Sequence, residues 1–223
     1  MAKTKVRGRL GFAVAAAAAA LVLAFSLAGC ASGQKGTSDQ GSSTQAAQSE
    51  TRTFTDSLGR EVELPATIDR IAASGPLAQN VLLTVAPDKM VGLATKIADD
   101  QAKYLGSEYA SLDVFGQIYG GKGDFNKEAV AAADPQVVID VGEAKDGMKD
   151  DLDTLQEQIG IPVVHIASSL DSYDETYTML GDLLGVQDRA KVLADYCKKA
   201  YDETSSVMAG IPETERANVL YCV

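Results

Sequence analysis

The stretches DPQVVID (residues 134–140) and GIPVVHI (residues 160–166) decide the fold of this chain. Each contains consecutive Val and Ile residues, a pattern typical of a strand that is buried on both faces. Residues 148–159 between them carry a helical pattern, which Gly160 and Pro162 end. A strand, a helix and a second strand in this order predict two parallel strands joined by a helical crossover.

The alternation of strands and helices continues on both sides of this unit. It predicts an α/β fold in which helices cover both faces of a parallel sheet. At its N-terminal end, an alternating segment closed by Pro65 predicts a small hairpin. The predicted elements are this hairpin over residues 53–64, strands at 70–73, 90–93 and weakly 113–115, and helices at 76–85, 98–106, 126–133 and 173–184.

Residues 186–209 predict one long helix with no strand directly before it. Gly210 and Pro212 end this helix, and the apolar segment 217–223 predicts a strand at which the sequence stops. Because one strand cannot complete a sheet of its own, we interpret the sequence as truncated within a second lobe. The expected parts are an N-terminal α/β lobe (53–185), a connecting helix (186–210) and the first strand of the second lobe (211–223).

Residues 1–29 are interpreted as a signal peptide. Four cations and no acid precede an apolar run over residues 10–28, which leads into LAGC (27–30). LAGC resembles the lipobox of bacterial lipoproteins, which implies cleavage before Cys30 and lipid on its thiol and new amino group. The alternative is a transmembrane helix, because the run is nearly long enough to span a bilayer.

The expected mature protein is therefore exported and held at the extracytoplasmic face of the cell membrane by its acyl chains. Residues 30–52 are rich in Gly, Ser, Thr and Gln, so we expect a flexible linker between the lipid and the lobe. Without residues 1–29 the chain keeps 16 cationic and 31 acidic side chains, a formal charge of −15. This acidity excludes nucleic acid and an anionic membrane surface as partners, because both require clustered cations.

The cysteines and histidine give no sign of a metal site. Cys197 and Cys222 either pair in an oxidising compartment or remain two thiols. No Cys or His spacing indicates zinc. His165, the only histidine, lies inside an apolar strand, where a hydrogen-bonded structural histidine is expected. A resident metal is therefore not predicted.

Several short motifs follow one another along the chain in a fixed order. They are TDSLGREV (55–62) with Pro65 and Arg70-Ile71, VGL (91–93), NKEAV (126–130), DPQVVI (134–139) and GIPVV (160–164). Their order and spacing over residues 53–223 resemble the substrate-binding lipoproteins of ABC importers. The class is the one with a rigid helical hinge, which handles siderophores, haem and cobalamin. The helix 186–209 lies where that family has its interlobe hinge.

The resemblance implies a two-lobed periplasmic-binding-protein fold that clamps its ligand between the lobes. The implied function is capture of an iron-siderophore, haem or cobalamin-like metal chelate, which the receptor delivers to ABC permease subunits. Separate subunits hydrolyse ATP in such importers, so the chain is expected to be no enzyme and to need no cofactor. The alternatives are a surface lipoprotein that serves as adhesin or sensor, and an enzyme that uses the same two lobes.

Candidate ligand-binding residues come from the loops after the strands, because ligands of open parallel sheets lie beyond the carboxyl ends of the strands. Lysines in these loops are expected to meet anionic groups of a chelate, and Tyr104 or Tyr119 to stack on it. The candidates are Ser74, Gly75, Pro76, Leu77, Thr95, Lys96, Tyr119, Lys122, Gly142, Glu143 and Lys145.

Glu128 matches the family position at which a glutamate of the N-terminal lobe docks against an arginine of the permease. The helix dipole alone also favours an acid in the first turn of a helix.

Two enzyme motifs in the sequence are incomplete. GQIYGGKG (116–123) nearly matches a phosphate-binding loop, but Gly123 stands where the motif needs Ser or Thr. No GxSxG elbow supplies a serine nucleophile.

Overall fold

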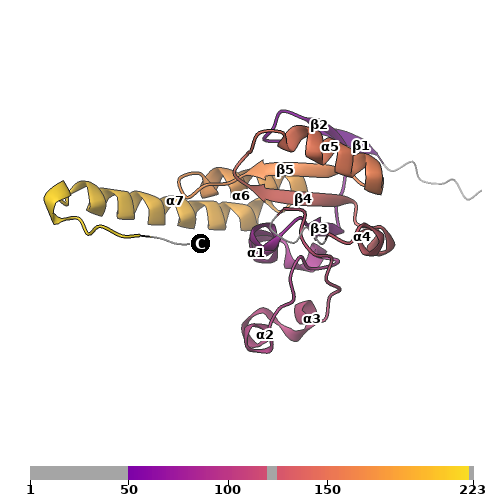
Figure 1. The fold of residues 1–223 in the computed structure, drawn as a ribbon, viewed down its shortest axis with the longest axis horizontal. Helices are drawn as coiled ribbons and strands as arrows, with labels where there is room; N and C mark the ends of the chain where they lie inside the picture. Colours follow the sequence, from indigo (N-terminus) through magenta and orange to yellow (C-terminus); the bar gives the residue numbers. More distant parts are fainter. Residues whose placement is uncertain (1–49, 120–124, 221–223) are drawn as a thin grey trace, which may run out of the picture. The chain divides into compact units, whose positions relative to one another are not determined.

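A three-stranded parallel sheet lies at the centre of the structure, a computed structural model that describes residues 50–119 and 125–220. The strands are ordered β3 (Ile71–Ala73), β4 (Val137–Gly142) and β5 (Val163–Ala167), as Figure 1 shows. All described residues belong to the second of two compact units, Ala47–Val223. The predicted signal peptide, Cys30 and most of the predicted linker lie outside the described residues.

Helices cover both faces of this sheet, which confirms the predicted α/β class. Strand residues alternate between two apolar cores, so that Ile139 and Val164 lie in one core while Val138 and Val163 lie in the other. Burial on both faces explains why these strands contain consecutive apolar residues. The first core is shared with α1 (Pro76–Val85), α6 (Tyr173–Leu184) and the start of α7 (Gln187–Ala209), and the second with α4 (Lys127–Ala133) and α5 (Met148–Ile159).

Local chemistry sets the ends of these helices. The Asn126 side chain accepts a hydrogen bond of 3.0 Å from the Ala129 amide, which caps α4 as the sequence predicts. Gly160 (φ 66°) and Gly185 (φ 70°) end α5 and α6 in the left-handed conformation that glycine adopts without strain. The bounds of α1, α5 and α6 are those predicted from the sequence.

A hairpin of β1 (Thr51–Thr55) and β2 (Glu61–Pro65) confirms the predicted N-terminal element. Its turn covers the free edge of β5. The Ser57 amide donates to the His165 carbonyl at 2.9 Å, and the Ala167 amide donates to Ser57 Oγ at 2.9 Å. Arg60 Nη1 donates to the Val163 carbonyl at 3.0 Å. The turn thus satisfies backbone groups that an open edge strand would leave unpaired.

The strands predicted at 90–93 and 113–115 are wrong, because only the isolated bridges Ile71–Met90 and Leu93–Val114 form there. The backbone at Gly92 lies so close to the Phe115 ring that a Cβ atom would come within 2.1 Å of it. The remaining elements are η1 (Pro87–Lys89), α2 (Asp99–Leu105), α3 (Ser107–Ala110) and η2 (Glu213–Glu215).

The long helix α7 confirms the helix predicted at 186–209. Its first half packs on α6, where Ala190 and Ala194 are buried, and its second half extends beyond the sheet (Figure 1). Residues 217–220 form no strand, in contrast to the prediction for 217–223, and Val219 is 83% exposed. A strand requires a neighbouring strand for its hydrogen bonds, and none lies beside these residues in the described part of the chain.

Candidate functional site

A cavity of about 300 Å³ lies at the carboxyl ends of β3 and β4. This is the place at which open parallel sheets bind their ligands. The sequence predicted eight of the residues that line it, and it missed four more. The eight are Ser74, Gly75, Pro76, Leu77, Tyr119, Gly142, Glu143 and Lys145, and the other four are Ala78, Asp140, Val141 and Met148.

Two helices begin at this cavity. The helix α1 starts at Pro76, and its N-cap Gly75 offers no side-chain acceptor to the amides of the first turn. The helix α5 starts at Met148 after Gly147, which has a φ of 80°. The first amides of a helix have no acceptor within the helix and lie at the positive end of its dipole. Pro76 has no N–H, and the Met148 amide donates to the Lys145 carbonyl at 3.2 Å, so the donors offered to the cavity are the other amides of these first turns.

A row of polar side chains crosses the sheet between the apolar core and the cavity. The Ser74 hydroxyl donates to Oδ1 of Asp140, and Nδ1 of His165 lies 2.7 Å from Oδ2 of the same carboxylate. Ser74 directly follows β3, and Asp140 and His165 are paired neighbours within β4 and β5. Asp140 is 5% exposed and His165 is fully buried. Ser74 and Asp140 form the inner end of the cavity, whereas His165 contacts Asp140 but does not line the cavity.

This row has the residue types of a serine hydrolase but the wrong order. In a catalytic triad the imidazole lies between the serine and the carboxylate, so that it can take the serine proton. Here the Asp140 carboxylate lies between Ser74 and His165. The Nε2 atom of His165 is buried without a hydrogen-bond partner among the described residues. The arrangement therefore fits hydrogen bonding better than nucleophilic attack.

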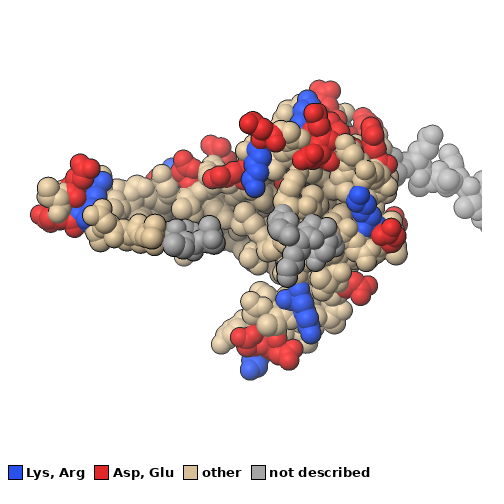
Figure 2. All heavy atoms as spheres, in the orientation of Figure 1, with Lys and Arg blue, Asp and Glu red and all other residues tan. Residues whose placement is uncertain are grey.

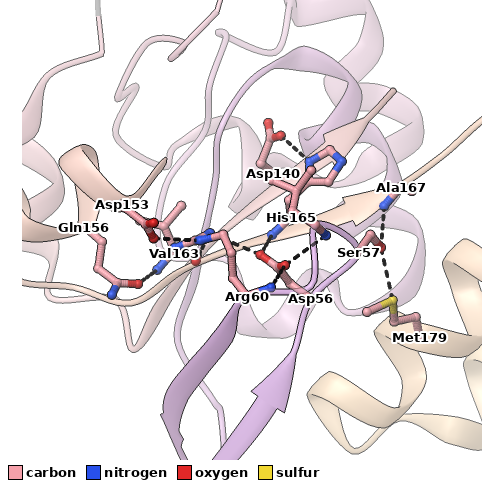
Figure 3. Close-up of polar contacts among 11 residues, drawn as sticks. Asp56, Ser57, Arg60, Asp140, Asp153, Gln156, Val163, His165, Ala167 and Met179 are labelled. Carbon is pink, nitrogen blue, oxygen red and sulfur yellow. Dashed lines mark hydrogen bonds and ion pairs between the residues drawn. The ribbon is translucent and has the colours of Figure 1, made fainter. Parts of the chain in front are cut away.

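The turn of the N-terminal hairpin is hydrogen-bonded to the backbone of His165, one member of this row (Figure 3). The His165 amide donates to Oδ2 of Asp56 at 3.2 Å, and Arg60 Nη1 donates to the same oxygen at 3.1 Å. Arg60 Nε also donates to Oδ1 of Asp153 in α5 at 2.8 Å. The DSLGR segment (56–60) of the motif quoted above thus joins the hairpin, β5 and α5.

Tyr119 contributes a hydroxyl that has no hydrogen-bond partner among the described residues, although the oxygen is buried. Burial raises the pKa of Tyr119 to about 12, the negative charges of Asp140 and Asp151 raise it as well, and Arg60 opposes them. The phenol therefore keeps its proton at neutral pH. It can donate a hydrogen bond to a group that enters the cavity.

The structure separates the other candidate residues from the cavity. Thr95 and Lys96 are exposed and do not line it, and the Thr95 amide donates to Oε1 of Gln79 at 2.9 Å. Lys122 lies outside the described residues. Glu128 is exposed in the first turn of α4, also away from the cavity.

Asp140 is the charged residue of the cavity lining that the sequence interpretation missed. The sequence did mark this residue, because Asp140 is the only charged residue within the predicted strand 137–140. An acid in a strand buried on both faces needs hydrogen-bond partners, and those partners come from β3 and β5. Their identity depends on the strand order, which the sequence alone does not give.

Acidic side chains lie over most elements of the face shown in Figure 2, with the basic ones scattered among them. Among the described residues, no group of three His, Cys, Asp or Glu side chains is placed to bind a metal. Cys197 is a free thiol, and Cys222 lies outside the described part of the chain. No helix within residues 50–119 or 125–220 has both the length and the apolar character needed to cross a membrane.

Comparisons with known proteins identify relatives of this fold. A family model described as "Periplasmic binding protein" matches residues 77–221. No curated protein sequence matches the chain. An ABC transporter solute binding protein from Sulfurospirillum deleyianum is 26% identical, with a TM-score of 0.65 over 74% of this chain and 52% of that one.

Two further solved structures share the fold at lower identity. A periplasmic solute binding protein from Veillonella parvula is 22% identical, with a TM-score of 0.54 over 74% of this chain and 50% of its own. The molybdate binding protein MolA of Haemophilus influenzae is 17% identical, with a TM-score of 0.56 over 74% of this chain and 56% of that one. The chain thus spans about half the length of the solved structures that it matches. These relatives are named for binding solutes and not for catalysis, in agreement with the expectation that the chain is no enzyme.

Proposed function

Because this chain belongs to the periplasmic binding protein family, we propose that it is the substrate-binding component of an ABC importer, acting outside the cytoplasmic membrane. The observation that carries this proposal is the cavity of about 300 Å³ at the carboxyl ends of β3 and β4. Two helix N-termini and a buried polar row surround this cavity, and such groups orient a bound solute without reacting with it.

The proposed solute is a metal chelate, namely an iron-siderophore, haem or a cobalamin-like corrinoid. The resemblance of the sequence motifs to the helical-hinge class supports this choice. The cavity is also bordered by Lys145 and Tyr119, one side chain that can pair with an anionic group and one that can stack on or hydrogen-bond to a chelate. Thr95 and Lys96 remain outside this proposed site, and Lys122 remains a sequence prediction.

The ligand is proposed to lie between this lobe (53–185) and a second lobe that begins at residues 211–223. The connecting helix (186–210) contains α7, whose second half presents an apolar groove of about 440 Å³. Tyr196, Tyr201 and Met208 of α7 line this groove together with Leu170. Apolar surface of this extent is commonly covered by a neighbouring domain. The matched part of this chain covers only about half of each relative's length, so the relatives have further residues that can supply such a domain.

Attachment to the membrane is proposed to occur through lipid on Cys30. The test is a cell fractionation in which wild-type protein stays with the membrane while the Cys30→Ser variant is released.

Delivery of the ligand to the permease is proposed to use Glu128, which is exposed on α4 and therefore free to meet an arginine of the permease. Glu128→Lys is then expected to lower uptake without weakening ligand binding. Glu157→Lys, on the exposed side of α5, is the matched control.

The binding proposal is tested by thermal unfolding of the purified mature chain, with Cys30→Ser to keep it unlipidated. Ferrioxamine B, haem and cyanocobalamin are the expected ligands, and maltose, a tripeptide and molybdate are the comparison set. Preferential binding to the folded state raises Tm, so at least one chelate is expected to raise it. A rise with maltose, the tripeptide or molybdate and none with the chelates would contradict the assignment.

A further inference from the structure

The two polar side chains at the inner end of the cavity, Ser74 and Asp140, are hydrogen-bonded to each other. A serine hydroxyl has one proton to donate, and Ser74 donates it to Asp140. The Asp140 carboxylate receives that bond and faces Nδ1 of His165 at 2.7 Å. An ionised carboxylate has about four lone-pair sites, so part of its acceptor capacity stays free. Toward the cavity, both side chains can therefore accept hydrogen bonds and neither can donate one.

Tyr119, in contrast, offers a hydrogen-bond donor. Its hydroxyl oxygen is buried beside the same cavity and has no partner among the described residues. A buried hydroxyl without a partner costs free energy, which a ligand acceptor would recover. The pKa of about 12 keeps this hydroxyl protonated, so it remains a donor at every physiological pH.

The charges around the cavity disfavour a ligand carboxylate at this inner end. Asp140 is a buried carboxylate, Glu143 is a second one at the exposed rim, and Lys145 is the one cation among the described lining residues. A second carboxylate placed against Asp140 would be repelled, because like charges are weakly screened where water is excluded. An anionic group is accommodated better at the rim beside Lys145.

We propose that the inner end of the cavity selects an amide group of the ligand, whose N–H donates to Ser74 and Asp140 and whose carbonyl accepts from Tyr119. An amide carries a donor and an acceptor on adjacent atoms, whereas a carboxylate carries acceptors only. This selection rests on the proposed function and narrows it. Chelates that carry carboxamides are preferred to those that present free carboxylates.

The test compares four probes by titration calorimetry with the mature chain. Ferrioxamine B and cyanocobalamin carry amide N–H groups, whereas ferric citrate and haem present carboxylates. We expect at least one amide-bearing probe to bind more tightly than both carboxylate-bearing probes. Tighter binding of ferric citrate or haem overturns the selection but leaves the proposed function standing. Absence of binding by all four probes overturns the proposed function and the selection with it.

Two variants then assign the preference to these residues. Asp140→Asn removes the charge and keeps the size, so the affinity ratio of amide to carboxylate probes is expected to fall about tenfold. Tyr119→Phe removes only the hydroxyl that lacks a partner, so it is expected to weaken the amide probe about tenfold with no loss of Tm. Asp88→Asn, the same chemical change at an exposed site, is the matched control.

The two variants keep the proposal testable even if one does not fold. Should Asp140→Asn fail to fold, Tyr119→Phe decides, because its hydroxyl has no hydrogen bond to lose among the described residues. An unchanged affinity of Tyr119→Phe for the amide probe overturns the proposed contact. An Asp140→Asn variant that weakens all probes equally overturns the charge selection, since a purely structural role would have that effect.

Discussion

Arg60 and Asp56 form a buried ion pair beside the candidate site, with side chains 3% and 0% exposed. Removing one partner of a buried pair leaves the other charge without compensation, which is far more costly than losing a pair on the surface. The Arg60→Met variant is therefore expected to lower the free energy of unfolding by about 3–5 kcal/mol. Urea denaturation followed by circular dichroism measures this change.

The matched control for Arg60→Met is Lys191→Met, which removes a cation from the exposed pair of Lys191 with Asp195. Its effect on the urea midpoint is expected to be small, because exposed pairs are screened by water and salt. Equal midpoints for the two variants would show that the pair of Arg60 and Asp56 contributes no more than a surface contact.

Tyr119 predicts a specific dependence of stability on pH. Its pKa is raised from the model-peptide value of 10.0 to about 12, so in the alkaline range the folded state keeps a proton that the unfolded state has lost. The contribution of this group is complete below pH 10 and is lost as the pH rises toward 12. Stability should fall more steeply above pH 10 in the wild type than in Tyr119→Phe. Parallel curves for the two proteins between pH 9 and 11.5 would contradict the raised pKa.

At the level of single residues, sequence and structure agree where a residue acts locally. Asn126 caps α4 and Gly160 ends α5, and both roles follow from neighbours within a few positions. Asp140 and Asp56 act across long separations, with His165 25 and 109 positions away. Such partners are fixed by the strand order and by the docking of the hairpin, so the sequence alone did not reveal them.

At the level of elements, the packing of α6 on α7 depends on Gly181. A Cβ atom at this position would lie 2.6 Å from the Cβ of Ala190, so the two helices would have to separate. The Gly181→Ala variant is expected to lower the free energy of unfolding by about 1–3 kcal/mol, as overpacking of a tight core does. Gly210→Ala is the matched control, because its nearest contact would be 3.4 Å and its backbone is already helical.

The same pair of variants tests how firmly α7 is joined to the lobe. Thermal unfolding of each variant gives the comparison directly. A lower Tm for Gly181→Ala and an unchanged Tm for Gly210→Ala are expected. If Gly181→Ala unfolds at the wild-type temperature, the close approach of α6 and α7 is wrong.

Elements with strong boundary signals were predictable and those that depend on neighbours were not. The helix 76–85 begins at a proline and the helices 148–159 and 173–184 end at glycines, so their bounds matched. The segments 90–93, 113–115 and 217–220 have strand-like composition but form no strand. These strand predictions were wrong because a strand forms only where a neighbouring backbone completes its hydrogen bonds.

The candidate site followed from the fold class rather than from a chemical motif. Parallel strands place their carboxyl ends together, so the loops after β3 and β4 were expected to meet, and they surround one cavity. Thr95 and Lys96 were assigned by the same rule to a strand at 90–93. That strand does not form, and these two residues lie outside the cavity.

At the level of the whole molecule, α7 extends past the carboxyl ends of the strands (Figure 1), on the side where the cavity lies. Residues 217–220 do not enter the central sheet, so α7 does not lead back into the lobe within the described residues. Together with the half-length match to the solved structures, this course supports the proposed second lobe.

The most direct test of the account locates the bound ligand on the chain. Amide NMR spectra of the mature chain are recorded during titration with cyanocobalamin and with the gallium complex of ferrioxamine B. The account predicts shifts for the amides of residues that line the cavity, namely Ser74, Gly75, Leu77, Ala78, Tyr119, Gly142, Glu143 and Lys145. Shifts confined to the groove at Tyr196 and Tyr201, with the cavity residues unchanged, would contradict it.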